Sequence, residues 1–268
     1  MTTVRIGGVA NKLWCPESED DLPCLPRQID GTYRIISGGS NLLINDARTF
    51  DDVIYMGDYD KSIHSLGNGR YRVGSSVRVQ RLIRRINKDG YGGIEELFSI
   101  PAMIGGLICM NASVPSANTC ISQHLESVEV FDGERIIRFP KDNCGFGYRQ
   151  SRFQDGQMIV LSAVFSFPSQ DAEISRMRVE ERMKKVKQSQ DRSHPNFGSV
   201  FRVCDSRIMH LVRRAGVRKG GASFSEKTLN WLLCDHASFA DAIVCINRVR
   251  LLHSILLRKN ELEVMIWE

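Results

Sequence analysis

One stretch decides the fold class of this chain: Tyr33-Arg34-Ile35-Ile36-Ser37-Gly38-Gly39-Ser40-Asn41-Leu42-Leu43-Ile44. Its central glycine-rich loop follows one apolar run and leads directly into another. Such loops expose consecutive backbone N–H groups that can cradle a phosphate, although a loop this short also fits an ordinary turn. The sequence lacks the GxGxxG spacing of a Rossmann fold, and no helical stripe follows it. The pattern therefore favours a phosphate loop between strands over a Rossmann dinucleotide site.

The composition is that of an ordinary globular protein. The chain has 268 residues, 42% hydrophobic and 25% charged, a length that suggests two domains and a sizeable core. These values exclude long disorder, collagen, coiled coil and a disulfide-rich miniprotein. The net charge of +5 suits small anionic ligands and is too weak to indicate nucleic acid.

The cysteines and apolar runs predict a reduced cytoplasmic protein. The eight cysteines form no CxxC pair, so we expect free thiols and no metal site. The first residues lack the apolar run of a signal peptide. Residues 97–125 contain no Asp, Glu, Lys or Arg, but prolines and glycines interrupt them. We therefore expect buried, irregular backbone that faces a ligand rather than a membrane span.

Periodicity and turn signals predict a mixture of helices and strands. Val79, Leu82, Ile83 and Ile86 form one apolar stripe that ends at Gly90, which predicts a helix. Asp132-Gly133 predicts a hairpin with a type I′ turn. Further expected elements are strands over 33–36, 42–44, 53–56, 71–74, 158–167 and 262–267, and helices over 172–190, over 206–215 and from a capping box at Ser238.

A shift in composition at Pro168 predicts the boundary between two domains. We expect an α+β architecture with one domain over residues 1–167, divided into subdomains over about 1–60 and 61–167. A smaller α+β domain is expected over 168–268.

Seven motifs in order resemble the UDP-N-acetylenolpyruvoylglucosamine reductases, also called UDP-N-acetylmuramate dehydrogenases. Together they cover nearly the whole chain: Thr2-Thr3-Val4-Arg5-Ile6-Gly7-Gly8, Gly38-Gly39-Ser40-Asn41-Leu42-Leu43, residues 100–106 with Asn111, residues 146–153, Gly198-Ser199-Val200-Phe201-Arg202, Gly220-Gly221-Ala222 with Ser225-Glu226-Lys227 and Asn230-Trp231, and Leu262-Glu263-Val264. The resemblance implies a PCMH-type FAD-binding domain over 1–167. It also implies a C-terminal substrate-binding domain whose last strand returns to the flavin.

The resemblance also implies ligands and roles for individual residues. The cofactor is FAD, NADPH is the co-substrate, and the substrate is a UDP-linked enolpyruvyl amino sugar that is reduced to UDP-N-acetylmuramate for peptidoglycan synthesis. Arg149 would stabilise the developing enolate, Ser199 would protonate the α-carbon, and Glu263 would hold the enolic form. The expected FAD contacts are Ser37, Gly38, Gly39, Ser40, Asn41, Leu42, Pro101, Gly105, Gly106 and Asn111, and the expected substrate contacts are Tyr148, Arg202 and Asn230.

Two alternatives stay open at the level of sequence. Val203-Cys204 stand where the family usually has Asn-Pro, which would suit a different lactyl-type nucleotide sugar in a polysaccharide pathway. The second alternative is a flavin-binding paralogue without turnover, and the presence of Arg149, Ser199 and Glu263 together argues against it. We expect no metal, nucleic-acid or membrane partner, and a monomer or small homo-oligomer.

Overall fold

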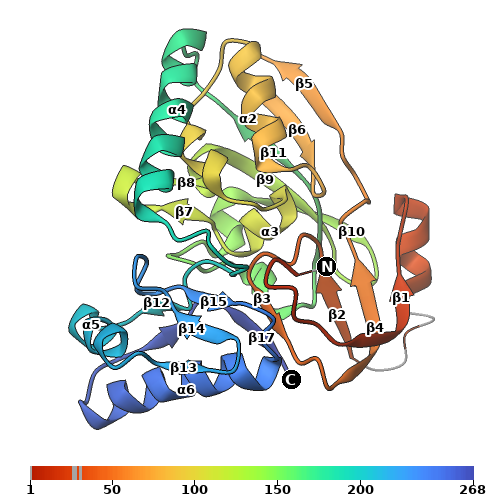
Figure 1. Cartoon of the computed structure of the whole chain (residues 1–268). Helices are drawn as coiled ribbons and strands as arrows, with labels where there is room; N and C mark the ends of the chain where they lie inside the picture. The colour runs from red at the N-terminus through yellow and green to blue at the C-terminus, as the bar shows by residue number, and fades with distance from the viewer. Residues whose placement is uncertain (1, 26–28, 30–31) are drawn as a thin grey trace. The chain divides into compact units, whose positions relative to one another are not determined.

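The computed structural model describes residues 2–25, 29 and 32–268. The chain forms two compact units with interleaved segments (Figure 1). The sheet unit contains residues 10–38 and 51–186, and the C-terminal unit contains residues 1–9, 39–50 and 187–268. These units are not contiguous, unlike the ranges expected from the break at Pro168.

The sheet unit is built on five antiparallel strands in the order β10-β9-β11-β6-β5. The strands are β5 (Ile63–Gly67), β6 (Arg70–Gly74), β9 (Leu125–Phe131), β10 (Ile136–Pro140) and β11 (Ile159–Ser166). The larger core of the unit joins these strands to helices α2 (Val79–Lys88) and α3 (Ile104–Cys109). The four apolar residues of the predicted stripe on α2 are all buried, which confirms this helix.

The remaining elements of the sheet unit lie around this core. A three-stranded sheet has the order β1-β4-β2. Its strands β1 (Val9–Trp14) and β4 (Thr49–Tyr55) each start in the C-terminal unit, and β2 is Tyr33–Ile36. The unit ends with α4 (Ala172–Ser189), whose last three residues belong to the C-terminal unit. The short elements are η1 (Glu19–Cys24), η2 (Glu95–Ser99), β7 (Ser113–Val114), η3 (Pro115–Ala117), β8 (Thr119–Cys120), η4 (Ile121–His124), η5 (Lys141–Cys144) and η6 (Arg152–Asp155).

The C-terminal unit packs short strands against two helices, α5 (Ser206–Arg214) and α6 (Phe239–Ile255). The Ser238 side chain accepts a hydrogen bond from the N–H of Asp241, and the Asp241 carboxylate accepts one from the N–H of Ser238, which confirms the capping box. The strands are β3 (Leu42–Ile44), β12 (Phe201–Val203), β13 (Arg218–Lys219), β14 (Ala222–Phe224), β15 (Leu232–Cys234), β16 (Glu261–Leu262) and β17 (Met265–Trp267).

Pairing between distant segments explains why the units are interleaved. β3 pairs in parallel with β17, so residues 39–50 are tied to the end of the chain. Val4, Ile6 and Leu43 are buried in the same core as α5 and α6. Hydrophobic burial therefore groups both N-terminal segments with the last eighty residues, a grouping that no local change in composition reveals.

Two local expectations were wrong in detail. The 125–140 hairpin forms, but four residues connect its strands, and only Gly133 has a positive φ, of 101°. A type I′ turn requires positive φ at both central residues. The predicted final strand is divided into β16 and β17, because the N–H groups of Glu263 and Val264 both donate to the carbonyl oxygen of Val200.

All eight cysteines are free. Burial raises the pKa of the Cys245 thiol to about 11 and that of Cys234 to about 12, so both are protonated at neutral pH. Among the described helices, none has the length and apolar character needed to cross a membrane.

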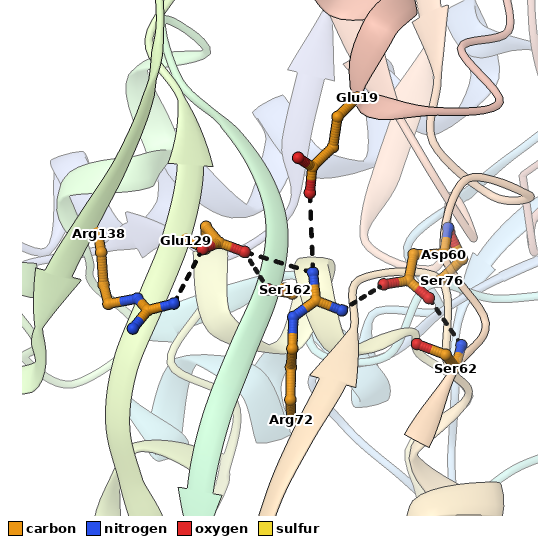
Figure 2. Close-up of polar contacts among 8 residues, drawn as sticks. All are labelled: Glu19, Asp60, Ser62, Arg72, Ser76, Glu129, Arg138 and Ser162. Atoms are coloured by element: carbon orange, nitrogen blue, oxygen red, sulfur yellow. Dashed lines mark hydrogen bonds and ion pairs between the residues drawn. The ribbon is translucent and has the colours of Figure 1, made fainter. Parts of the chain in front are cut away.

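A group of charged side chains, which we call the Arg72 cluster, lies on the five-stranded sheet (Figure 2). It consists of Arg72, Glu19, Asp60, Glu129 and Arg138. The Arg72 guanidinium donates to Asp60 over 3.1 Å and to Glu129 over 3.3 Å, and it lies 3.9 Å from Glu19. Arg138 donates to the other carboxylate oxygen of Glu129 over 3.1 Å.

The cluster makes the stability of the sheet unit depend on pH. Burial works to raise the pKa of Glu129, but hydrogen bonds from Ser162 and Arg138 and the charge of Arg72 hold it below its ordinary value of 4.5. Because the folded-state pKa is lowered, ionised Glu129 stabilises the fold above the ordinary pKa. This contribution is lost as the pH falls through the folded-state pKa.

We expect Glu129→Gln to lower the free energy of unfolding by about 1–3 kcal/mol at pH 7, because both arginines lose a charged partner. The difference from the wild type should shrink between pH 7 and an acidic pH below the lowered pKa of Glu129, where the wild-type carboxylate is protonated too. Urea denaturation at the two pH values measures both quantities. An equal loss of stability at both pH values would contradict an electrostatic origin.

Candidate functional site

The glycine-rich loop after β2 has the backbone geometry expected of an anion-binding loop. Gly39 has a φ of 56°, in the left-handed region that favours glycine. Within the described ranges, no acceptor is found for the N–H groups of Gly38, Gly39 and Ser40. These donors are therefore available to a ligand, as the sequence predicts for a phosphate loop.

A second predicted FAD segment, residues 101–106, leads into α3 in the sheet unit. The N–H of Gly105 donates to the carbonyl oxygen of Ser75 over 2.9 Å. A Cβ atom at Gly105 would lie only 3.2 Å from the Cβ of Ser75, so this close approach of two backbones favours glycine. At Gly106 a Cβ would lie 3.7 Å from the hydroxyl oxygen of Ser37. The two predicted FAD segments therefore lie close together at Ser37 and Gly106, while Pro101 is exposed.

The end of α3 is linked to the turn that carries Tyr148 and Arg149. Gly147 and Gln150 exchange two backbone hydrogen bonds, so Tyr148 and Arg149 occupy the tip of a two-residue turn. The Asn111 side chain donates to the carbonyl oxygen of Gly147 over 2.8 Å. Tyr148 is 56% exposed, and Arg149 is half-buried with a positive φ of 54°. A positive φ is costly for an arginine and is typical of positions where function constrains the backbone.

Buried polar atoms without partners test whether FAD fits these residues. In the sheet unit, the hydroxyl oxygen of Ser75 and the carbonyl oxygen of the Asn111 side chain have no hydrogen-bond partner among the described residues. Buried polar groups are nearly always satisfied, and an exception calls for a missing ligand or water. Together with the N–H group of Gly38 in the same unit, these atoms fit a cofactor rich in polar atoms.

The C-terminal unit brings Ser199, Asn230, Glu263 and Asn41 into one hydrogen-bonded network. Ser199 forms a bridge with Trp231, and the next residue, Val200, donates its N–H to the carbonyl oxygen of Asn230 over 2.8 Å. The carbonyl oxygen of Val200 accepts from the N–H of Glu263 over 2.8 Å. The Asn41 side chain donates to the carbonyl oxygen of Glu263 over 2.9 Å. The backbones of Ser199 and Glu263 are thus fixed relative to each other and to the glycine-rich loop.

The two predicted substrate contacts in this unit have protein partners. The Asn230 amide accepts from the N–H of Phe201 over 3.1 Å and donates to the carbonyl oxygen of the same residue over 2.7 Å. Arg202 donates to Glu261 over 2.8 Å, and Lys259 lies 2.7 Å from the same carboxylate. Hydrogen bonds from Lys259 and Arg202 lower the pKa of Glu261. In this structure Asn230 positions the strand that follows Ser199, and the charge of Arg202 is balanced by Glu261.

Comparisons with known proteins show which family the chain belongs to. Residues 13–136 match the family model described as an FAD binding domain. The UDP-N-acetylenolpyruvoylglucosamine reductase of Carboxydothermus hydrogenoformans is 32% identical over 258 residues, which cover 93% of this chain and 84% of the relative. The chain belongs to the UDP-N-acetylenolpyruvoylglucosamine reductase family.

Two further members of this family are also similar to the chain. The reductase of Geotalea uraniireducens is 30% identical over 87% of this chain and 78% of its own length. The crystal structure of the reductase from Thermus caldophilus has a TM-score of 0.80 and 27% sequence identity, covering 100% of this chain and 96% of that one. The predicted α+β fold with an FAD-binding domain of the reductase family is therefore confirmed.

The predicted site residues of this reductase family member fall into two groups. The C-terminal unit contains Gly39, Ser40, Asn41, Leu42, Ser199, Arg202, Asn230 and Glu263, and the sheet unit contains Ser37, Gly38, Pro101, Gly105, Gly106, Asn111, Tyr148 and Arg149. The sequence did not indicate Ser75 as a site residue. The available signal was Gly74-Ser75-Ser76 between a strand and a helix, which is weak without the contact to Gly105.

Proposed function

We propose that this chain reduces the enolpyruvyl ether of UDP-N-acetylglucosamine-enolpyruvate to UDP-N-acetylmuramate, with FAD as cofactor and NADPH as reductant. The product is a precursor of peptidoglycan. The observation that carries the proposal is the network joining Ser199 to Glu263 and Asn41, within a chain that belongs to the reductase family. The relatives named above carry this substrate in their names, which favours it over the different nucleotide sugar that Val203-Cys204 would suit and over a paralogue without turnover.

The reaction adds a hydride to the β-carbon of the enol ether and a proton to its α-carbon. When bound, FAD supplies the hydride that originates from NADPH. Negative charge then builds up on the substrate carboxylate as an enolate. Its stabilisation before protonation is the main task of the protein.

Three residues are assigned to this task. Arg149 offers a planar guanidinium whose N–H groups match a carboxylate in geometry. Ser199 donates the proton to the α-carbon, and Glu263 holds the enolic form through a hydrogen bond. Tyr148, Arg202 and Asn230 are proposed to contact the substrate, with Arg202 reaching the diphosphate after it leaves Glu261.

We propose that the enzyme works in the cytoplasm as a monomer or small homo-oligomer, without a metal, nucleic acid or membrane partner. Through the supply of peptidoglycan precursor it would support cell shape and division. The net charge of +5 would modestly attract FAD, NADPH and the sugar diphosphate.

Anaerobic titration tests the function directly. The purified protein should be yellow, NADPH should bleach it, and UDP-N-acetylglucosamine-enolpyruvate should then restore the colour with formation of UDP-N-acetylmuramate. A colourless protein that does not take up FAD would overturn the proposal. A flavin that NADPH bleaches but the nucleotide sugar does not reoxidise would overturn the assigned substrate.

A further inference from the structure

The Arg72 cluster is connected to the predicted FAD segment through Asp60. One carboxylate oxygen of Asp60 accepts from Arg72, and the other accepts from the N–H of Ser62 over 2.7 Å (Figure 2). A Cβ atom at Gly74 would lie 2.3 Å from the carboxyl carbon of Asp60. Glycine at position 74 therefore lets the Asp60 side chain lie directly against the loop of residues 74–77.

The backbone of Asp60 holds the same loop from a second direction. The N–H of Ser76 donates to the carbonyl oxygen of Asp60 over 3.0 Å, and the N–H of Asp60 donates to the Ser76 hydroxyl over 3.3 Å. The Ser76 hydroxyl donates in turn to the carbonyl oxygen of Met56. Ser76 is only 2% exposed, so these bonds are shielded from water and fix the loop firmly.

Loop 74–77 in turn forms backbone hydrogen bonds with the segment 101–106. Gly105 donates its N–H to the carbonyl oxygen of Ser75, and Ile104 donates to that of Val77, both over 2.9 Å. Just beyond the loop, the N–H of Val79 donates to the carbonyl oxygen of Ala102 over 3.1 Å. Two backbone hydrogen bonds to the loop, and a third from the first residue of α2, thus fix the position of this segment.

The loop also contains a feature that points to a ligand. Ser75 is 2% exposed, and its hydroxyl oxygen has no partner in the described part of the chain. Its neighbour Ser76 is equally buried and fully bonded. The backbone and Cβ of Ser75 lie next to Gly105, near the start of helix α3.

We propose that the Arg72 cluster is a positioning element for the flavin. Arg72 fixes Asp60, Asp60 fixes loop 74–77, and the loop fixes segment 101–106 against the cofactor. Arg72 and Asp60 are positioning residues, since they act through the loop rather than by touching FAD. The inference rests on the proposed function in one respect, namely that FAD binds along segment 101–106.

The test compares FAD dissociation constants of the full-length protein, measured by fluorescence titration of the apoprotein. Arg72→Met is expected to weaken FAD binding about tenfold, equivalent to about 1.4 kcal/mol. Asp60→Asn should weaken it several-fold, because the amide keeps the bond from Ser62 and loses the ion pair. Arg72→Lys should restore part of the affinity, since it keeps the charge without the fork. The visible absorption band of the bound flavin should shift in Arg72→Met as its surroundings change.

Arg70→Met is the matched control. Arg70 lies on the same strand and forms a bidentate pair with Glu126, but it has no hydrogen bond to loop 74–77. The Arg70→Met variant should change FAD affinity less than twofold. Equal dissociation constants and spectra for Arg72→Met, Asp60→Asn and Arg70→Met would overturn the inference. A wild type that takes up no FAD would instead overturn the proposed function.

Discussion

Replacement of Ser199 by alanine is expected to lower turnover of the enolpyruvyl nucleotide sugar about a thousandfold and to leave reduction of the flavin by NADPH unchanged. A positioned proton donor contributes typically 10²–10⁴ in rate. The backbone of Ser199 is held by the bridge to Trp231 and by the neighbouring bond from Val200 to Asn230. The alanine variant therefore keeps the local fold and loses the hydroxyl alone.

Stopped-flow measurement of the two half-reactions separates these effects. Ser223→Ala is a suitable control, because Ser223 is a half-buried serine of the same unit outside the candidate site. Its variant should match the wild type in both half-reactions. Ser199→Cys should recover part of the turnover, since a thiol can also give up a proton. Full turnover in Ser199→Ala would rule out its role as proton donor.

Local signals in the sequence were sufficient to predict helices α2 and α5. The stripe of α2 is buried as expected, and α5 ends at Arg214, two residues before Gly216 with its φ of 58°. Both features depend on residues within a few positions of each other. Helix periodicity, capping and positive φ at glycine are local properties, and a single sequence records them directly.

The hairpin shows why a local signal can fail in detail. The Asp132 carboxylate accepts hydrogen bonds from the N–H groups of Glu134 and Arg135. This arrangement stabilises a longer, four-residue connection, and Gly133 alone takes the positive φ. Asp-Gly fits both connections, so the sequence alone did not distinguish the loop lengths.

The roles of polar residues in the C-terminal unit depend on contacts between distant positions. Arg202 meets Glu261, 59 residues away, and Asn41 meets Glu263 across 222 residues. A motif identifies Arg202 as a cation, but only the fold shows that Arg202 and Lys259 share the carboxylate of Glu261. Likewise, the break between β16 and β17 arises from bonds to Val200 that no pattern within residues 261–267 records.

Replacement of Arg149, whose backbone has a positive φ, is expected to lower activity strongly and to change stability little. Its φ of 54° costs an L-residue about 1 kcal/mol relative to glycine. Its guanidinium lies 5.9 Å from the Tyr148 ring, a contact worth about 0.5 kcal/mol at an exposed site. Relief of this strain opposes the loss of the side-chain contacts, so Arg149→Gly should change the free energy of unfolding of the apoprotein by no more than about 1 kcal/mol. Turnover should fall about a hundredfold to a thousandfold, because the enolate loses its cationic partner.

Urea denaturation of the apoprotein and steady-state kinetics measure the two sides of this prediction. Asn68→Gly is the matched control, because Asn68 also has a positive φ, of 50°, in a turn between β5 and β6 of the same unit. It should leave turnover unchanged. Arg149→Lys keeps the charge but not the planar fork, so its turnover should lie between those of wild type and Arg149→Gly. Full activity in Arg149→Gly would show that Arg149 has no role in the reaction. A clear loss of stability would show that its side-chain contacts outweigh the strain, and that the fold rather than the substrate requires arginine at this position.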